Sequence, residues 1–187
     1  MPSDQSAIQN QVKNRFSKFQ VATAIAVLFH SIGIAGLLYF DKTFFLQSTP
    51  VNLLLMFVLL LWTQREKNTY FFLFLVTCFS VGIAVEMVGI HTGILFGNYS
   101  YGNVLGYKIQ GVPLLIGANW FIIIYCSGIS IHTILMKAIN RISADTGKRP
   151  MALKALSVII DGATLAVFFD WLMEPVAVKL GYWAWKG

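Results

Sequence analysis

The sequence predicts an all-α fold, a polytopic transmembrane helical bundle of about five spans with a re-entrant or lid-like loop after the third. Three observations lead to this class. Hydrophobic residues make up 57% of the 187 residues and charged residues 12%, whereas a soluble domain is about a quarter charged. Apolar runs of about 20 residues, the length that crosses a bilayer, recur along the chain. The basic residues lie between these runs, as they do in the loops of membrane proteins.

The N-terminal part predicts a polar segment followed by two spans. Residues 1–18 are polar and are expected to be a cytoplasmic segment ahead of a single transmembrane helical domain, residues 19–187. The first span, about residues 19–40, is long enough to be a retained helix rather than a cleaved signal peptide. The second span, about residues 44–63, has Pro50 near its start and is strongly apolar only over residues 51–62.

Three further apolar runs predict spans at about residues 70–90, 113–136 and 151–172. The last run ends in AVFFDWLMEP, residues 166–175, where Pro175 is expected to close the segment. The segment between the third and fourth spans, residues 91–113, has five glycines and is too polar to span. Because glycine permits close approach and positive φ, we expect this loop to re-enter the membrane or to cover the outer helix ends. An ordinary exposed loop is the alternative.

The distribution of Lys and Arg predicts the orientation in the membrane. With a cytoplasmic N-terminus, ten of these residues fall inside and four outside, as the positive-inside rule requires. The inside set is Lys13, Arg15, Lys18, Arg65, Lys67, Lys137, Arg141, Lys148, Arg149 and Lys154, and the outside set is Lys42, Lys108, Lys179 and Lys186. We therefore expect an integral protein of a prokaryotic inner or plasma membrane. No nucleic-acid partner is expected, because the basic residues mark loops rather than an aromatic-bearing surface.

Four of the eight acidic residues lie in or at the edge of predicted spans: Glu86, Asp161, Asp170 and Glu174. A carboxylate at mid-bilayer depth costs on the order of 3 kcal/mol, so such residues usually face the bundle interior and have a function. Asp170 and Glu174 are one helical turn apart and share a face. The predicted orientation places both at the outer side, level with Glu86 and Asn119. Asp161, about 13 Å deeper, is the predicted floor of the same cavity.

These carboxylates also have purely structural interpretations. Asp170 and Glu174 could be interfacial side chains that reach toward water. Glu86 could pair with His91 or a lysine as a structural clamp, and Asp161 could have a purely structural role.

The remaining patterns limit the chemistry. Tyr182, Trp183 and Trp185 are expected to form an interfacial aromatic belt. The sequence has no pair of histidines four residues apart, no Cys/His cluster, no phosphate-binding glycine loop and no nucleophile elbow. Neither a metal nor a cofactor is therefore expected, and the chemistry would depend on carboxylates, amides, tyrosines and tryptophans.

These groups suit proton-initiated chemistry on an alkene. A carboxylic acid in an apolar site can keep its proton at neutral pH and act as a general acid. Aromatic faces attract the cation that protonation of a C=C bond produces. A substrate that enters from the lipid would be an isoprenoid. The residues alone leave a proton-coupled transporter as an alternative.

Three stretches resemble signature blocks of the membrane carotenoid-biosynthesis family: EMVGIHTGILFGNYSYGNVLG, GVPLLIGANWF and DWLMEPVAVKLGYWAW. That family contains the carotenoid 1,2-hydratases, including γ-carotene 1′,2′-hydratase and bisanhydrobacterioruberin hydratase. The resemblance covers about residues 82–187 and implies cofactor-independent addition of water to the terminal 1,2 double bond of an acyclic ψ-end group. The blocks map onto Glu86, His91, Thr92, Asn98, Tyr99, Asn119, Trp120, Asp170, Glu174 and Pro175. Family members continue past the last block into a further span, so a chain ending at Gly187 is expected to be a truncated form or a short relative.

The combined prediction is a carotenoid hydratase that takes its substrate from the lipid phase. Asp170 or Glu86 would donate the proton and Glu174 would position the water. The predicted substrate-binding residues are His91, Tyr99, Asn119, Trp120, Trp171 and Asp161. The alternatives are a carotenoid cyclase or isomerase that uses the same protonation step, and a non-catalytic membrane transporter or subunit. Other carotenoid enzymes are further candidate partners.

Overall fold

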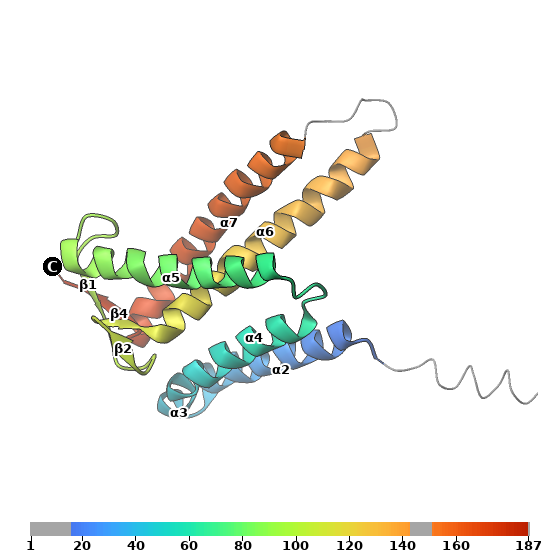
Figure 1. Ribbon diagram of the computed structural model, residues 1–187. Helices are drawn as coiled ribbons and strands as arrows, with labels where there is room; N and C mark the ends of the chain where they lie inside the picture. Colours follow the sequence, from blue (N-terminus) through green and yellow to red (C-terminus); the bar gives the residue numbers. More distant parts are fainter. Residues whose placement is uncertain (1–15, 143–150, 187) are drawn as a thin grey trace, which may run out of the picture.

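The computed structural model describes residues 16–142 and 151–186, and most of this chain is helical (Figure 1). The predicted N-terminal segment, residues 1–18, lies almost entirely outside the described residues, as does the loop 143–150. The helices are α2 (Lys18–Tyr39), α3 (Lys42–Gln47), α4 (Thr49–Thr63), α5 (Thr69–Thr92), α6 (Leu114–Ile142) and α7 (Met151–Leu180). The strands are β1 (Tyr99–Tyr101), β2 (Lys108–Ile109), β3 (Val112–Pro113) and β4 (Trp183–Trp185).

Four helices of the described chain, α2, α5, α6 and α7, are long and apolar enough to cross a membrane. They confirm the predicted fold class and four of the predicted spans. The second predicted span is divided instead. Asp41 begins α3 by accepting hydrogen bonds from the backbone N–H groups of Thr43 and Phe44, and Pro50 lies in the first turn of α4, where its missing N–H costs nothing. The resulting α4 has 15 residues, about 23 Å at 1.5 Å per residue, less than the ~30 Å of a bilayer core.

The prediction that Pro175 closes the last span is wrong, because α7 continues through it to Leu180. Membrane helices tolerate proline where neighbouring groups satisfy the freed backbone. The residue that follows the helix, Gly181, adopts φ 74°. The N–H of Gly181 donates to the carbonyl of Val178, and that of Tyr182 donates to the carbonyl of Ala177. These two bonds form a Schellman motif, so the stop signal is the glycine rather than the proline.

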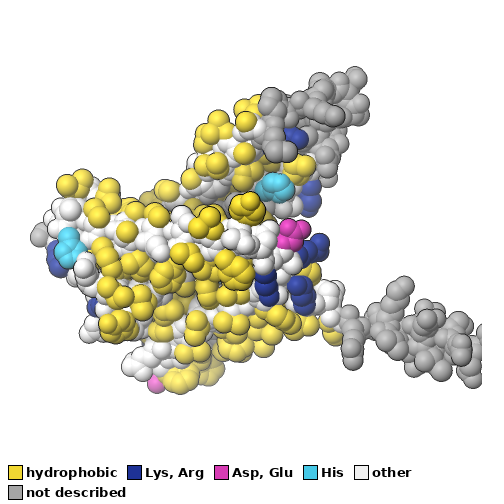
Figure 2. Space-filling view, in the orientation of Figure 1, with side chains coloured by type: hydrophobic (Ala, Val, Ile, Leu, Met, Phe, Trp, Pro, Cys, Tyr) yellow, Lys and Arg dark blue, Asp and Glu magenta, His cyan; other side chains and the backbone are white. Residues whose placement is uncertain are grey.

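The helices form a three-helix group, α5 to α7, with α2 and α4 beside it (Figure 1). A Cβ on Gly162 of α7 would lie 3.4 Å from Gly128 Cα of α6, and such small residues let two membrane helices approach closely. Phe121 of α6 is fully buried and packs with Phe71 and Cys78 of α5. Hydrophobic side chains cover much of the outer surface of the helices, as expected for contact with lipid (Figure 2).

The loop between α5 and α6 covers one end of the three-helix group (Figure 1). Its strand β1 pairs antiparallel with β4, which follows α7, and its strands β2 and β3 form a hairpin. Gly102 must be glycine, because a Cβ there would collide with the carbonyl oxygen of Gly181. Tyr99 and Leu105 are only 5% and 4% exposed. These features confirm a lid-like loop rather than an ordinary exposed one.

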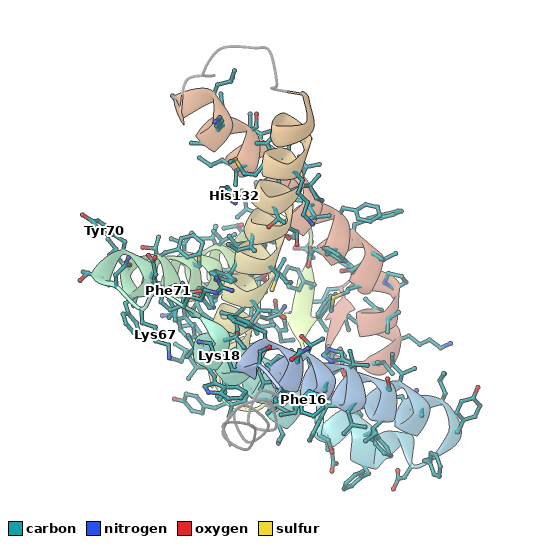
Figure 3. All side chains as sticks on the ribbon, turned by 90° about the vertical axis from the view of Figure 1, so that its right-hand side faces the viewer. Phe16, Lys18, Lys67, Tyr70, Phe71 and His132 are labelled. Atoms are coloured by element: carbon teal, nitrogen blue, oxygen red, sulfur yellow. The ribbon has the colours of Figure 1, made fainter. Side chains whose placement is uncertain are left out.

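The opposite end of the molecule carries basic residues beside α2 and α5 (Figures 2 and 3). The Lys18 ammonium lies 5.3 Å and the Arg65 guanidinium 4.9 Å from the centre of the Phe19 ring. Figure 3 places Lys67 at the same end. A cytoplasmic position for this end is what the charge distribution predicts, and that orientation stays a prediction.

Candidate active site

Glu86 is the centre of the site. It lies in α5, is 7% exposed, and its carboxylate accepts three side-chain hydrogen bonds. The Trp120 indole donates to Oε1 at 3.0 Å, and the hydroxyls of Tyr99 and Tyr101 donate to Oε2 at 2.5 and 2.7 Å. These donors come from α6 and β1, so one carboxylate ties α5 to both elements. The predicted alternative of a Glu86–His91 clamp is wrong, because His91 Nδ1 donates to the Met87 carbonyl instead, at 2.7 Å.

The two tyrosines that hold Glu86 are fixed as hydrogen-bond donors. Burial, and then the neighbouring Glu86 carboxylate, raises the pKa of the Tyr99 and Tyr101 hydroxyls above their ordinary value. Ionisation would place a second negative charge against Glu86. Both hydroxyls therefore keep their protons at physiological pH and keep donating to the carboxylate.

Two glycines of α5 make room for the donors. Gly82 lies one turn before Glu86 and Gly89 one turn after it. A Cβ on Gly82 would lie 2.8 Å from the Trp120 side chain, and one on Gly89 would lie 3.1 Å from the Tyr99 hydroxyl oxygen. Because these two glycines have no Cβ, Trp120 and Tyr99 can come within hydrogen-bonding distance of the Glu86 carboxylate.

We expect Gly82→Ala to destabilise the protein by about 1–3 kcal/mol, the typical effect of an extra methyl in a packed interior, because the Trp120 side chain must move away from Glu86. The measurement is thermal unfolding in detergent, followed by circular dichroism and tryptophan fluorescence. Gly33→Ala in α2 is the matched control, since a Cβ there meets nothing within 4 Å; it should be neutral or slightly stabilising. Equal melting temperatures for the two variants would contradict this account.

The packed face of α7 carries the next two carboxylates. Gly162, Ala166, Asp170 and Glu174 follow one another at four-residue spacing, so they lie on one face of the helix. Gly162 approaches α6, Ala166 is buried, and Ala166 and Asp170 line a small cavity of about 30 Å³ with Glu86 and other residues. Asp170 therefore faces the site. Within the part of the chain that the structure describes, its carboxyl group makes no side-chain hydrogen bond.

Glu174 holds the strand that closes the site. Trp183 Nε1 lies 3.0 and 3.1 Å from its two carboxylate oxygens, and Trp185 Nε1 donates to Oε1 at 2.7 Å. The same two tryptophans stand opposite Tyr101 and Tyr99 in the β1–β4 pair. Both indole N–H groups are therefore directed at a carboxylate, while an interfacial aromatic belt of Tyr182, Trp183 and Trp185 stays a prediction.

The three carboxylates share one cavity of about 300 Å³ between α5, α6, α7 and the paired strands. Trp120 and Trp171 are among its lining residues; the others are Phe96, Tyr99, Tyr101, Val167, Trp183 and Trp185. Asn119 lines the smaller cavity that lies between Glu86 and Asp170. The structure thus brings together seven of the nine predicted site residues.

His91 and Asp161 are the predicted site residues that the structure does not bring into this cavity. His91 lines a different pocket, at the end of α5. Asp161 lines none of the cavities described, whereas Asp170 lines two of them, although both side chains are exposed on α7. Asp161 precedes Asp170 by nine residues, which is about two and a half helical turns, so the two side chains leave α7 on opposite faces. The predicted depth of Asp161 ignored this rotation.

Sequence reasoning missed Tyr101, Trp183 and Trp185. A signal was present, because YSY and WAW each repeat an aromatic residue at the two-residue period of a strand. Two such tripeptides in one chain predict a cross-strand aromatic pair.

The described residues contain no group of three or more His, Cys, Asp and Glu side chains that could hold a metal ion. A family model described as "Carotenoid biosynthesis protein" matches residues 48–187, well over half of the chain. No curated protein and no solved structure matches the chain. The matched range includes every residue of the cavity.

Proposed function

Because the chain belongs to the carotenoid biosynthesis protein family, we propose that it is a hydratase that adds water to the terminal 1,2 double bond of an acyclic carotenoid ψ-end group. The observation that carries this proposal is the unequal bonding of three carboxylates around one cavity. Glu86 and Glu174 each accept hydrogen bonds from aromatic donors. Asp170, which lines the same cavity, has no such donor among the described residues.

This difference supports Asp170 as the proton donor. A carboxyl group that already accepts several hydrogen bonds is held as an acceptor, which fits Glu86 better for stabilising positive charge than for giving up a proton. Asp170 has both oxygens available to carry and deliver one. In the proposed first step, the Asp170 carboxyl transfers its proton to C2, the π electrons form the new C2–H bond, and a tertiary cation is left at C1.

The cavity walls suit that cation. The indole rings of Trp120 and Trp171 line the cavity, and an aromatic face attracts a cation by about 0.5–2 kcal/mol. Glu86 adds a fixed negative charge that three donors hold in place before the reaction begins, the arrangement that electrostatic catalysis requires.

Water has a place close to the predicted donor. The small cavity of about 30 Å³ has the polar side chains of Glu86, Asn119 and Asp170 in its lining and is large enough for a water molecule. Glu174 lines the larger cavity, which shares Glu86 and Asp170 with the small one. A water that passes from the small cavity into the larger one can form the C1–O bond with its lone pair and lose a proton to the Glu174 carboxylate. Three donor contacts leave Glu174 about one free acceptor position. Return of this proton to Asp170, one turn away, restores the starting state.

Access from the lipid phase is consistent with the exposure of the cavity rim. Val167 and Trp171 line the cavity and are 66% and 69% exposed on a helix long and apolar enough to span a membrane. An apolar polyene end group can therefore reach the carboxylates without passing through water, in which it is insoluble.

The test is expression of the chain in a host that accumulates lycopene or γ-carotene, with the pigments analysed by mass spectrometry. We expect a product heavier than its substrate by one water molecule. Glu66→Gln is the matched control, since Glu66 is an exposed loop carboxylate and its loss should leave the product yield unchanged. An unchanged mass with an altered absorption spectrum would favour a cyclase or isomerase. Unaltered pigments from a membrane-inserted protein would favour a transporter or a non-catalytic subunit.

A further inference from the structure

A second pocket, of about 500 Å³, shares the strand β1 with the carboxylate cavity, because Tyr99 and Tyr101 line both. Its cationic or potentially cationic residues come from three separate segments: His91 from α5, Lys108 from β2 and Lys186 from the residues after β4. We propose that this basic pocket binds a phosphate-bearing anion, either the headgroup of an anionic lipid or free phosphate. The proposal does not depend on the hydratase reaction.

The described lining of the basic pocket carries positive charge and no negative charge. None of its lining residues is acidic. Lys108 Nζ donates to the Tyr101 carbonyl at 2.7 Å and to Asn103 Oδ1 at 3.0 Å, and both acceptors are neutral. Lys186 uses its backbone N–H to bind the Asn98 carbonyl, and its side chain makes no hydrogen bond within the described residues. Neither lysine has a carboxylate partner among the described residues, so their two ammonium groups are available to an anion.

The predicted outer side is poor in positive charge, which makes this grouping notable. Four lysines are assigned to that side by the sequence, and two of them, Lys108 and Lys186, line one pocket. Their convergence results from the β1–β4 pair and the β2–β3 hairpin, which bring distant segments to the same place.

The depth and shape of the pocket suit a lipid phosphate. His91 is the last residue but one of the membrane-spanning helix α5, so the pocket lies where a span meets the headgroup region. Gln110 also lines it and has φ 46°, a left-handed conformation that is uncommon for residues other than glycine. With Gly111 at φ 88°, Gln110 forms the tight turn of the hairpin that carries Lys108, and its amide adds an uncharged donor.

Binding at the basic pocket would also affect β1. Lys108 holds the backbone carbonyl of Tyr101, and the hydroxyl of the same residue donates to Glu86. An anion that orders Lys108 therefore favours the position of β1 in which Glu86 keeps its donors. Since a ligand that binds the folded state stabilises it, the anion should raise the melting temperature.

The experiment uses the full chain purified in a zwitterionic detergent, with thermal unfolding measured after addition of phosphatidylglycerol, phosphatidylcholine or inorganic phosphate. We expect phosphatidylglycerol to raise the melting temperature and phosphatidylcholine to have little effect. A rise with lipid alone identifies a headgroup site, and a rise with inorganic phosphate identifies a free-anion site. No rise with either, or an equal rise with phosphatidylcholine, would overturn the proposal.

Variants then locate the effect. Lys186→Gln should weaken phosphatidylglycerol binding by about ten-fold, the effect of one charge-assisted contact, without changing the melting temperature of the lipid-free protein. Lys108→Arg keeps the charge and should retain binding. Lys42→Gln, at the start of α3 and outside the basic pocket, is the matched control and should bind as the wild type does. Wild-type binding by Lys186→Gln would place the anion elsewhere and reject this site.

Discussion

Asp170→Asn should lower the yield of hydrated carotenoid by about 10²–10⁴-fold, the range that a general acid contributes to an enzymatic rate. Asparagine matches aspartic acid in shape but has no acidic proton to give to C2. The loss should be chemical rather than structural, because Asp170 makes no side-chain hydrogen bond with the described residues and lines an open cavity. The measurement is product yield by mass spectrometry, normalised to the amount of membrane-inserted protein.

The control for this variant is its own stability. The melting temperature of Asp170→Asn should equal that of the wild type, which separates loss of chemistry from loss of folded protein. Asp170→Glu keeps an acidic proton but moves it by one methylene, so a small residual yield is expected from that variant. A normal yield from Asp170→Asn would remove Asp170 from the role of proton donor and leave Glu86 as the candidate.

Glu86→Gln is expected to lower the free energy of unfolding by about 1–3 kcal/mol, because it leaves a buried donor without an acceptor. The carboxylate accepts the Trp120 indole at Oε1 and both tyrosine hydroxyls at Oε2. A glutamine amide has one accepting oxygen, and its NH₂ group must then face a donor. The Trp120 indole N–H can only donate. If the glutamine oxygen takes the place of Oε2, the glutamine NH₂ group faces the indole N–H, and the hydrogen bond between residues 86 and 120 is lost.

A double-mutant cycle identifies the conflict. Trp120→Phe alone should also destabilise the protein, since it removes one donor from Glu86. Combined with Glu86→Gln, it removes the donor that the amide cannot satisfy, so the double variant should be more stable than the sum of the two changes predicts, by about 0.5–3 kcal/mol. Thermal or chemical unfolding in detergent gives the values. Additive effects would show that Trp120 and Glu86 do not act through one hydrogen bond.

The helices show what local sequence can predict. The spans that became α2, α5 and α6 begin within about one residue of their predicted positions, because a long apolar run specifies a membrane helix without reference to the rest of the chain. The end of α7 was predicted too early, since Glu174 and Pro175 lower the local hydropathy while the actual stop is the Schellman motif at Gly181. The second predicted span is divided into two helices because Asp41 caps the start of α3 and Pro50 lies in the first turn of α4.

The candidate site was also predicted in part from local properties of the sequence. Helical periodicity places Asp170 and Glu174 on one face, and a shared depth connects them to Glu86. Periodicity applied with the correct rotation also excludes Asp161 from that face. What it cannot provide is the partner of each carboxylate, since Trp120 lies 34 residues from Glu86 and is brought to it by the packing of α5 on α6.

The sequence by itself determined a membrane-embedded helical protein with carboxylates at one end of its spans, because length, hydropathy and helical period are local properties. The tertiary structure alone decided which carboxylate is free. Glu86 and Glu174 receive donors from β1 and β4, and these strands meet only through the antiparallel pairing of segments on either side of α6 and α7. Asp170 lines the same cavity and has no donor of this kind among the described residues. The difference in chemistry proposed for the three groups thus comes from long-range pairing, which depends on the folded chain as a whole.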